Sequence, residues 1–78
     1  MKVTITKPDS ILYDGEAKRV QLPGTGGLFE ILDRHAPIIS SLKRGTLRLI
    51  DADDKEHTFP VRGGVAKGQH NDLTILVQ

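Results

Sequence analysis

Apolar and polar residues alternate along most of this 78-residue chain, in short runs separated by turn-forming residues. Val3 and Ile5 alternate with threonines, and Leu47 and Leu49 lie on either side of Arg48. A period of two residues is that of a β-strand with one buried face. No window holds the apolar stripe of an amphipathic helix, so the pattern predicts strands throughout.

Turn signals recur about every eight to twelve residues, which is the spacing of a β-sandwich or barrel. They include Pro8-Asp9, Gly24–Gly27 and the acidic run 51–54. We also interpret Asp14-Gly15 as a hairpin turn that ends a short second strand at residues 11–13. The sequence therefore predicts an all-β fold, with residues 1–78 forming one domain.

The alternation also predicts which side chains face inward. Residues on the apolar face of each expected strand should form the core, and those we expect there are Val20, Leu47, Leu49, Val61 and Ile75. Pro60 cannot donate to a strand ladder, so its strand should lie at an edge or a bulge. Ile38 and Ile39 are adjacent and cannot both point inward, so one of them should be offered to a partner.

Composition excludes several classes of function. The 11 basic and 10 acidic side chains leave a net charge of +1, and only three aromatic residues are present, so nucleic acid is not an expected partner. There is no cysteine for a disulfide or a thiolate metal site. No apolar run is long enough to cross a bilayer, so we expect no direct membrane insertion, and an isolated monomer.

No segment matches a cofactor motif. The glycines at 24, 26 and 27 lack the Gly-Lys-Ser/Thr ending of a phosphate loop, and Phe29 stands where a dinucleotide fingerprint needs its third glycine. The acidic run 51–54 has Glu56 where a calcium loop needs glycine. His57 and His70 have no companion at metal-ligand spacing. We expect no cofactor and no metal.

A catalytic alternative rests on residue types alone. Asp33, His35, Ser40 and Ser41 include the side chains of a hydrolase triad. Neither serine lies in a nucleophile elbow, and all four lie on one short stretch, where a triad needs converging elements. A small hydrolase therefore stays the weaker reading, and we expect no catalytic residue.

The run Leu22–Ile39 carries a family resemblance. It contains, in order, Pro23-Gly24, two further glycines, Phe29 and His35-Ala36-Pro37. This order and spacing resemble the amino-terminal domain of the epsilon subunit of bacterial F-type ATP synthase, which is called the delta subunit in mitochondria. The opening Ile5–Pro8, the segment 12–16 and the segment 61–65 fit the same pattern. The resemblance implies a flattened antiparallel β-sandwich of about eight to ten short strands, in line with the turn count.

The resemblance also implies a function. Such a domain is non-catalytic, belongs to the central stalk, and helps couple ion translocation to ATP synthesis at the cytoplasmic face of the bacterial plasma membrane. Its expected partners are the gamma subunit and the ring of c subunits. By matching position, the gamma contacts are His35, Ala36, Pro37, Ile38, Ser40, Gly63 and Gly64. The c-ring contacts are Gly26, Gly27, Leu28, Glu30 and Asp33. The alternative from the residues alone is a free-standing β-sandwich that binds other proteins.

The sequence departs from the family pattern in three places. Gly26 and Leu28 stand where many relatives carry carboxylates, which leaves Glu30 as the nearest acid. Asp33-Arg34 replaces the Pro-Gly that often precedes His-Ala-Pro. The sequence reaches Gln78 directly after the last expected strand, so we expect no C-terminal helical hairpin, the element that regulates hydrolysis in longer relatives.

Overall fold

The structure, a computed structural model, describes residues 1–78 and contains eight strands and no helix. The prediction of an all-β fold of eight to ten short strands is therefore confirmed. No helix exists that is long and apolar enough to cross a membrane. The strands are β1 (Lys2–Lys7), β2 (Ser10–Gly24), β3 (Gly27–Leu32), β4 (Ile38–Leu42), β5 (Gly45–Asp51), β6 (Glu56–Val61), β7 (Gly64–Gln69) and β8 (Asp72–Val77).

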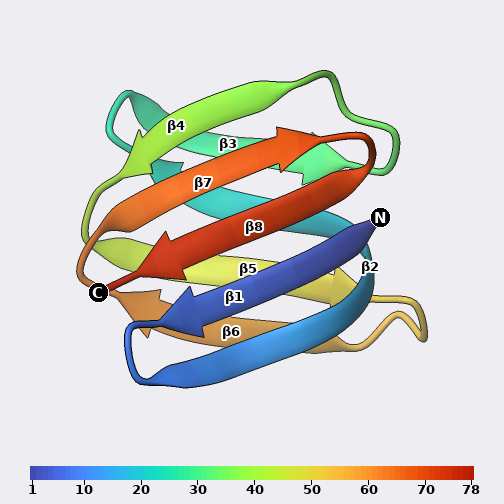
Figure 1. Cartoon of the computed structure of the whole chain (residues 1–78), viewed down its shortest axis with the longest axis horizontal. Helices are drawn as coiled ribbons and strands as arrows, with labels where there is room; N and C mark the ends of the chain where they lie inside the picture. Colours follow the sequence, from blue (N-terminus) through green and yellow to red (C-terminus); the bar gives the residue numbers. More distant parts are fainter.

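The strands form two layers (Figure 1). In one layer β4, β7, β8 and β1 lie side by side, and the first part of β2 continues this layer beyond β1. In the other, β3, the second part of β2, β5 and β6 are paired in that order. All pairs are antiparallel except β1 with β8. As predicted from Pro60, β6 lies at a sheet edge, since β5 is the one strand it pairs with.

The predicted hairpin at Asp14-Gly15 is wrong, because β2 runs through this pair as one strand of 15 residues. Asp14 pairs with Thr4 and Gly15 with Val3, so β1 holds the segment extended. The strand then leaves β1 and pairs with β5 from Ala17 and with β3 from Arg19 onward. Its register against β5 shifts at this crossing. Long-range pairing has therefore overridden a local turn signal.

The core fills the space between the two layers and is entirely apolar. Fifteen buried hydrophobic residues form one cluster, and no polar or charged residue is buried. The five predicted core residues all belong to this cluster, each no more than 4% exposed. Val20 is fully buried, and β2 places it opposite Ile31 on one side and Leu49 on the other. The alternation of the sequence thus identified the buried face correctly.

We predict that Leu49→Ala lowers the free energy of unfolding by roughly 2–5 kcal/mol, because it leaves a cavity in a thin core. Leu49 is fully buried, so neighbouring side chains must collapse into the gap or leave it empty. Urea unfolding measures the change. Thr58→Ala, at an exposed position of the adjacent strand, is the control and should stay within about 0.5 kcal/mol. An unchanged midpoint for Leu49→Ala would contradict this account of the core.

One carboxylate organises the turn between β5 and β6. Asp51 Oδ1 accepts hydrogen bonds from the backbone N–H groups of Asp53 (2.8 Å) and Lys55 (2.9 Å). Its Oδ2 lies 2.8 Å from Nε2 of His57, which packs edge-on against the Tyr13 ring. The hydrogen bond from His57, and then that from Lys55, hold the pKa of Asp51 below its ordinary value.

This lowered pKa predicts an acid-sensitive hairpin. A carboxylate that is more acidic in the folded state stabilises the fold above its unfolded pKa, and this contribution is lost as the pH falls through the folded value. The difference in unfolding free energy between the unsubstituted chain and Asp51→Asn should therefore shrink as the pH falls from about 5 to about 2.5. Denaturation at several pH values tests it. Asp53→Asn, whose carboxylate accepts no hydrogen bond, is the control. A constant difference for Asp51→Asn would refute the prediction.

Candidate docking surfaces

The strands β4, β7 and β8 are neighbours in one layer (Figure 1), and three exposed apolar side chains lie on the outer face of this part of the sheet. They are Ile39 (73% exposed), Leu76 (55%) and Val65 (41%), and we call them the apolar face. Val65 is directly opposite Leu76, and Ile39 lies on the next strand. The outward face of an antiparallel sheet is ordinarily polar, so this grouping is a candidate docking surface.

The structure separates the two adjacent isoleucines as the alternation predicted. Ile38 is half-buried and packs against the core, whereas Ile39 points outward. Ser40 is half-buried and shares the inward register of Ile38. Ile39 is therefore more exposed than its neighbours Ile38 and Ser40. The gamma contacts expected from the resemblance included Ile38 and Ser40 but not Ile39. Val65 and Leu76 were also missed, although Leu76 lies between Ile75 and Val77 in an apolar run that cannot be buried on both faces.

Two hollows lie beside the apolar face. One has a volume of about 280 Å³ and is lined partly by Pro37, Ile39 and Gly68. The other, about 290 Å³, is lined partly by Val65 and Leu76. The surface is therefore both apolar and indented, which gives a protein partner room for side chains.

Gly63 and Gly64 lie where β7 begins, close to Val65. Their φ angles of 158° and 153° favour glycine. A Cβ on Gly64 would collide with the Leu76 carbonyl, so glycine also permits the close approach of β7 and β8. Glycine at the start of β7 therefore lets this strand pair closely with β8, which brings Val65 and Leu76 together in the apolar face.

Residues 33–37, which we call the docking loop, join β3 to β4. Ala36 and Pro37 are exposed and His35 is half-buried. Asp33, which the resemblance placed among the c-ring contacts, is the first residue of this loop. Its side chain forms hydrogen bonds within the chain. Its carboxylate accepts hydrogen bonds from the Met1 amine and from Asn71 Nδ2 (3.0 Å), and these two bonds, in that order, hold the pKa of Asp33 below its ordinary value.

The β2–β3 hairpin carries the other residues expected at the c ring. Gly24 pairs with Gly27, which leaves Thr25 and Gly26 at the tip. Gly27 has a φ of 130°, which favours glycine, whereas a Cβ on Gly26 would meet open space. Leu28 follows with 67% exposure. Since β3 runs from Gly27 to Leu32, the structure places Gly26, Gly27 and Leu28 at one end of the strand and Asp33 beyond the other.

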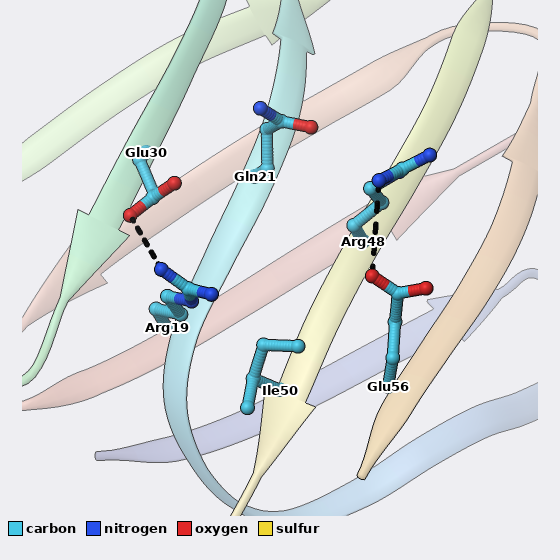
Figure 2. A pocket seen from close by; sticks show the side chains of 6 residues that line it. All are labelled: Arg19, Gln21, Glu30, Arg48, Ile50 and Glu56. Carbon is cyan, nitrogen blue, oxygen red and sulfur yellow. Dashed lines mark ion pairs between the residues drawn. The ribbon is translucent and has the colours of Figure 1, made fainter. Parts of the chain in front are cut away.

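A mainly polar hollow lies on the outer face of the β3-β2-β5-β6 layer (Figure 2). Arg19 lies 3.9 Å from Glu30, and Arg48 lies 3.7 Å from Glu56, around a hollow of about 120 Å³ that Gln21 and Ile50 also line. Two positive and two negative groups leave this hollow electrically balanced. Exposed ion pairs of this length contribute little to stability, so we interpret it as a solvated sheet face.

The possible hydrolase residues form no catalytic arrangement. His35 Nδ1 lies 3.0 Å from the Ala36 carbonyl, and Ser40 Oγ donates to the Ser41 carbonyl. Ser41 Oγ is engaged with Thr25 Oγ1 at 3.1 Å. No hydrogen bond joins the histidine to either serine, and no group of three His, Cys, Asp or Glu side chains could hold a metal ion. The geometry offers surfaces for docking.

A sequence model of the family described as "ATP synthase, Delta/Epsilon chain, beta-sandwich domain" matches residues 1–78. The chain belongs to this family. Being a delta/epsilon chain of ATP synthase, it is a non-catalytic stalk subunit. Two similar curated proteins are ATP synthase epsilon chains. That of Chlorobium limicola is 35% identical over 99% of this chain and 88% of its own length. That of Bordetella avium is 36% identical over 97% of this delta/epsilon chain, which spans 54% of the relative's length.

Solved structures share the fold of this delta/epsilon chain. A chain in a structure of the Euglena gracilis mitochondrial ATP synthase, described as OSCP/F1/c-ring, superposes with a TM-score of 0.89 at 19% identity. The match covers 96% of this chain and 48% of that one. A chain in a structure of the Tetrahymena thermophila mitochondrial enzyme, described as central stalk/c-ring, gives a TM-score of 0.82 at 19% identity, over 100% of this chain and 63% of that one.

Proposed function

We propose that this chain is the rotor subunit that joins the gamma subunit to the c ring and helps couple ion translocation to ATP synthesis. It would do so at the cytoplasmic face of the bacterial plasma membrane, held there by its partners. A domain without catalytic residues contributes through shape and adhesion. Its two candidate surfaces lie on different layers of the sandwich, so it could hold two partners at once.

The observation that carries the gamma contact is the apolar face, continuous with the docking loop. Pro37 of the loop and Ile39 of the sheet line the same hollow, so the loop and this part of the sheet form one surface. The gamma contact would then consist of the residues inferred from the resemblance, supplemented by the three exposed side chains. Their burial against a partner would remove apolar area from water, the main source of association energy. The full set is His35, Ala36, Pro37, Ile38, Ile39, Ser40, Gly63, Gly64, Val65 and Leu76.

The c-ring contact would lie at the tip of the β2–β3 hairpin. Gly26 and Gly27 expose backbone there, and Leu28 supplies an exposed apolar side chain. Glu30 shares the outward register of Leu28 and is the nearest carboxylate to the tip, although Arg19 partly neutralises it. The contact would thus depend on packing of Leu28 where many relatives have a charge. Asp33, at the far end of β3, would serve the docking loop.

We predict opposite outcomes for aspartate at the two adjacent isoleucines. Ile39→Asp should leave the chain folded but weaken gamma binding by roughly tenfold or more, since a carboxylate would be buried without a partner. Ile38→Asp should unfold the domain, because its side chain packs against the core. Thermal melts and titration with gamma separate the two effects. Thr58→Asp, on the opposite layer, is the matched control and should bind normally. Normal gamma binding by a folded Ile39→Asp variant would exclude the apolar face as the interface.

A second prediction concerns the hairpin tip. Leu28→Asp should keep its affinity for gamma but reduce co-purification of the gamma complex with the c ring, because the contact would lose its apolar side chain. Leu32→Asp is a matched control, since Leu32 is also exposed on the outward face of β3 but lies at its other end. Should Leu32→Asp alone reduce c-ring association, the contact would lie at the opposite end of the strand.

A further inference from the structure

The docking loop contains little hydrogen-bonded structure of its own. Of the backbone hydrogen bonds formed outside the strands, one involves this loop, from Asp33 N–H to the Lys18 carbonyl at 3.3 Å. Arg34 adopts a left-handed backbone conformation with φ of 62°, which residues other than glycine seldom take. Such a loop keeps one shape only when its surroundings determine that shape. The Met1 amine holds the Asp33 carboxylate, and the remaining side-chain contacts that do so come from the hairpin joining β7 to β8.

Asn71, in the turn of that hairpin, bridges the first two residues of the loop. Its Oδ1 accepts a hydrogen bond from Arg34 N–H at 2.6 Å, and its Nδ2 donates to Asp33 Oδ1 at 3.0 Å. The first bond joins residues 37 apart in sequence, and the second joins residues 38 apart. The amide uses a donor and an acceptor at once, which neither a carboxylate nor a hydrocarbon can do. Asn71 thereby holds the left-handed turn of the loop against the hairpin.

Gly68, on β7 of the same hairpin, provides the place for the His35 ring. A Cβ built on Gly68 would lie 2.5 Å from His35 Cε1 and 3.2 Å from His35 Nδ1, so the ring rests on the strand backbone. Nδ1 bonds to the Ala36 carbonyl, and Nε2 is buried without a partner. The ring therefore occupies its position through packing as well as through its one hydrogen bond.

We propose that Asn71 and Gly68 are positioning residues that hold the docking loop in the shape that binds the gamma subunit. The inference rests on the proposed function. Asn71 does not belong to the surface that gamma would touch, and Gly68 borders that surface by lining the hollow beside Ile39. Asn71 fixes where the loop turns, and Gly68 fixes how deeply His35 lies. The exposed residues Ala36 and Pro37 are thereby presented beside the apolar face. A loop free to change shape would have to be ordered on binding, which weakens association.

Asn71→Gly tests the bridge most cleanly. Asn71 has a φ of 61°, which glycine tolerates, so the variant removes the side-chain amide and keeps the turn. His70→Gly is the matched control, because His70 has a φ of 53° in the same turn and its side chain makes no hydrogen bond. Two measurements are made on both variants: hydrogen exchange of the Arg34 amide, and affinity for the isolated gamma subunit by titration calorimetry.

Asn71→Gly should speed exchange of the Arg34 amide and weaken gamma binding, each by roughly tenfold, while His70→Gly changes neither. Gly68→Ala, which displaces the His35 ring, should shift the His35 Hε1 resonance and weaken gamma binding to a similar extent. Equal affinities for Asn71→Gly and His70→Gly would overturn the positioning role. Failure of the unsubstituted chain to bind gamma would instead overturn the proposed function, and the exchange rates would still decide whether Asn71 holds the loop.

Discussion

The continuity of β2 is the constraint on which the rest of this sandwich depends. Its first part pairs with β1, its second part pairs with β3 and β5, and Gly24 at its end pairs with Leu42 of β4. One chain segment therefore holds four others and ties the two layers together. Both candidate docking surfaces begin from it, since the hairpin tip follows its last residue and β4 is attached to the same end.

Close backbone approach is the second constraint, and three glycines provide it. A Cβ on Gly24 would lie 2.7 Å from the Phe29 ring, and Gly64 and Gly68 leave similarly little space for a side chain. These positions bring the β2–β3 hairpin together and let β7 approach β8 on one side and His35 on the other. The same residue type that breaks local structure thus permits tight packing between distant segments.

In the proposed role the chain would transmit force through contacts with its partners, and its two layers offer different surfaces for them. An apolar face on one layer is suited to a lasting protein contact, whereas the hairpin tip on the other exposes a single large apolar residue, Leu28. The docking loop is tied back to the β7–β8 hairpin, so a load applied to the loop would pass into the sheet that bears the apolar face. The balanced ion pairs on the opposite sheet leave the hollow between them solvated.

By itself, the sequence determined the strand content, the buried face and the family. Alternation identified Val20, Leu47 and Leu49 as core because a half-buried strand requires a period of two, and it required that one of the two adjacent isoleucines be exposed. Only the tertiary structure decided that Asp14-Gly15 continues a strand and that Val65 and Leu76 share a surface with Ile39. It also decided that Asn71 holds Arg34 and Asp33, which lie far from it in the sequence. The physical reason is that local patterns report which way a side chain faces, whereas strand register brings together residues far apart in the sequence.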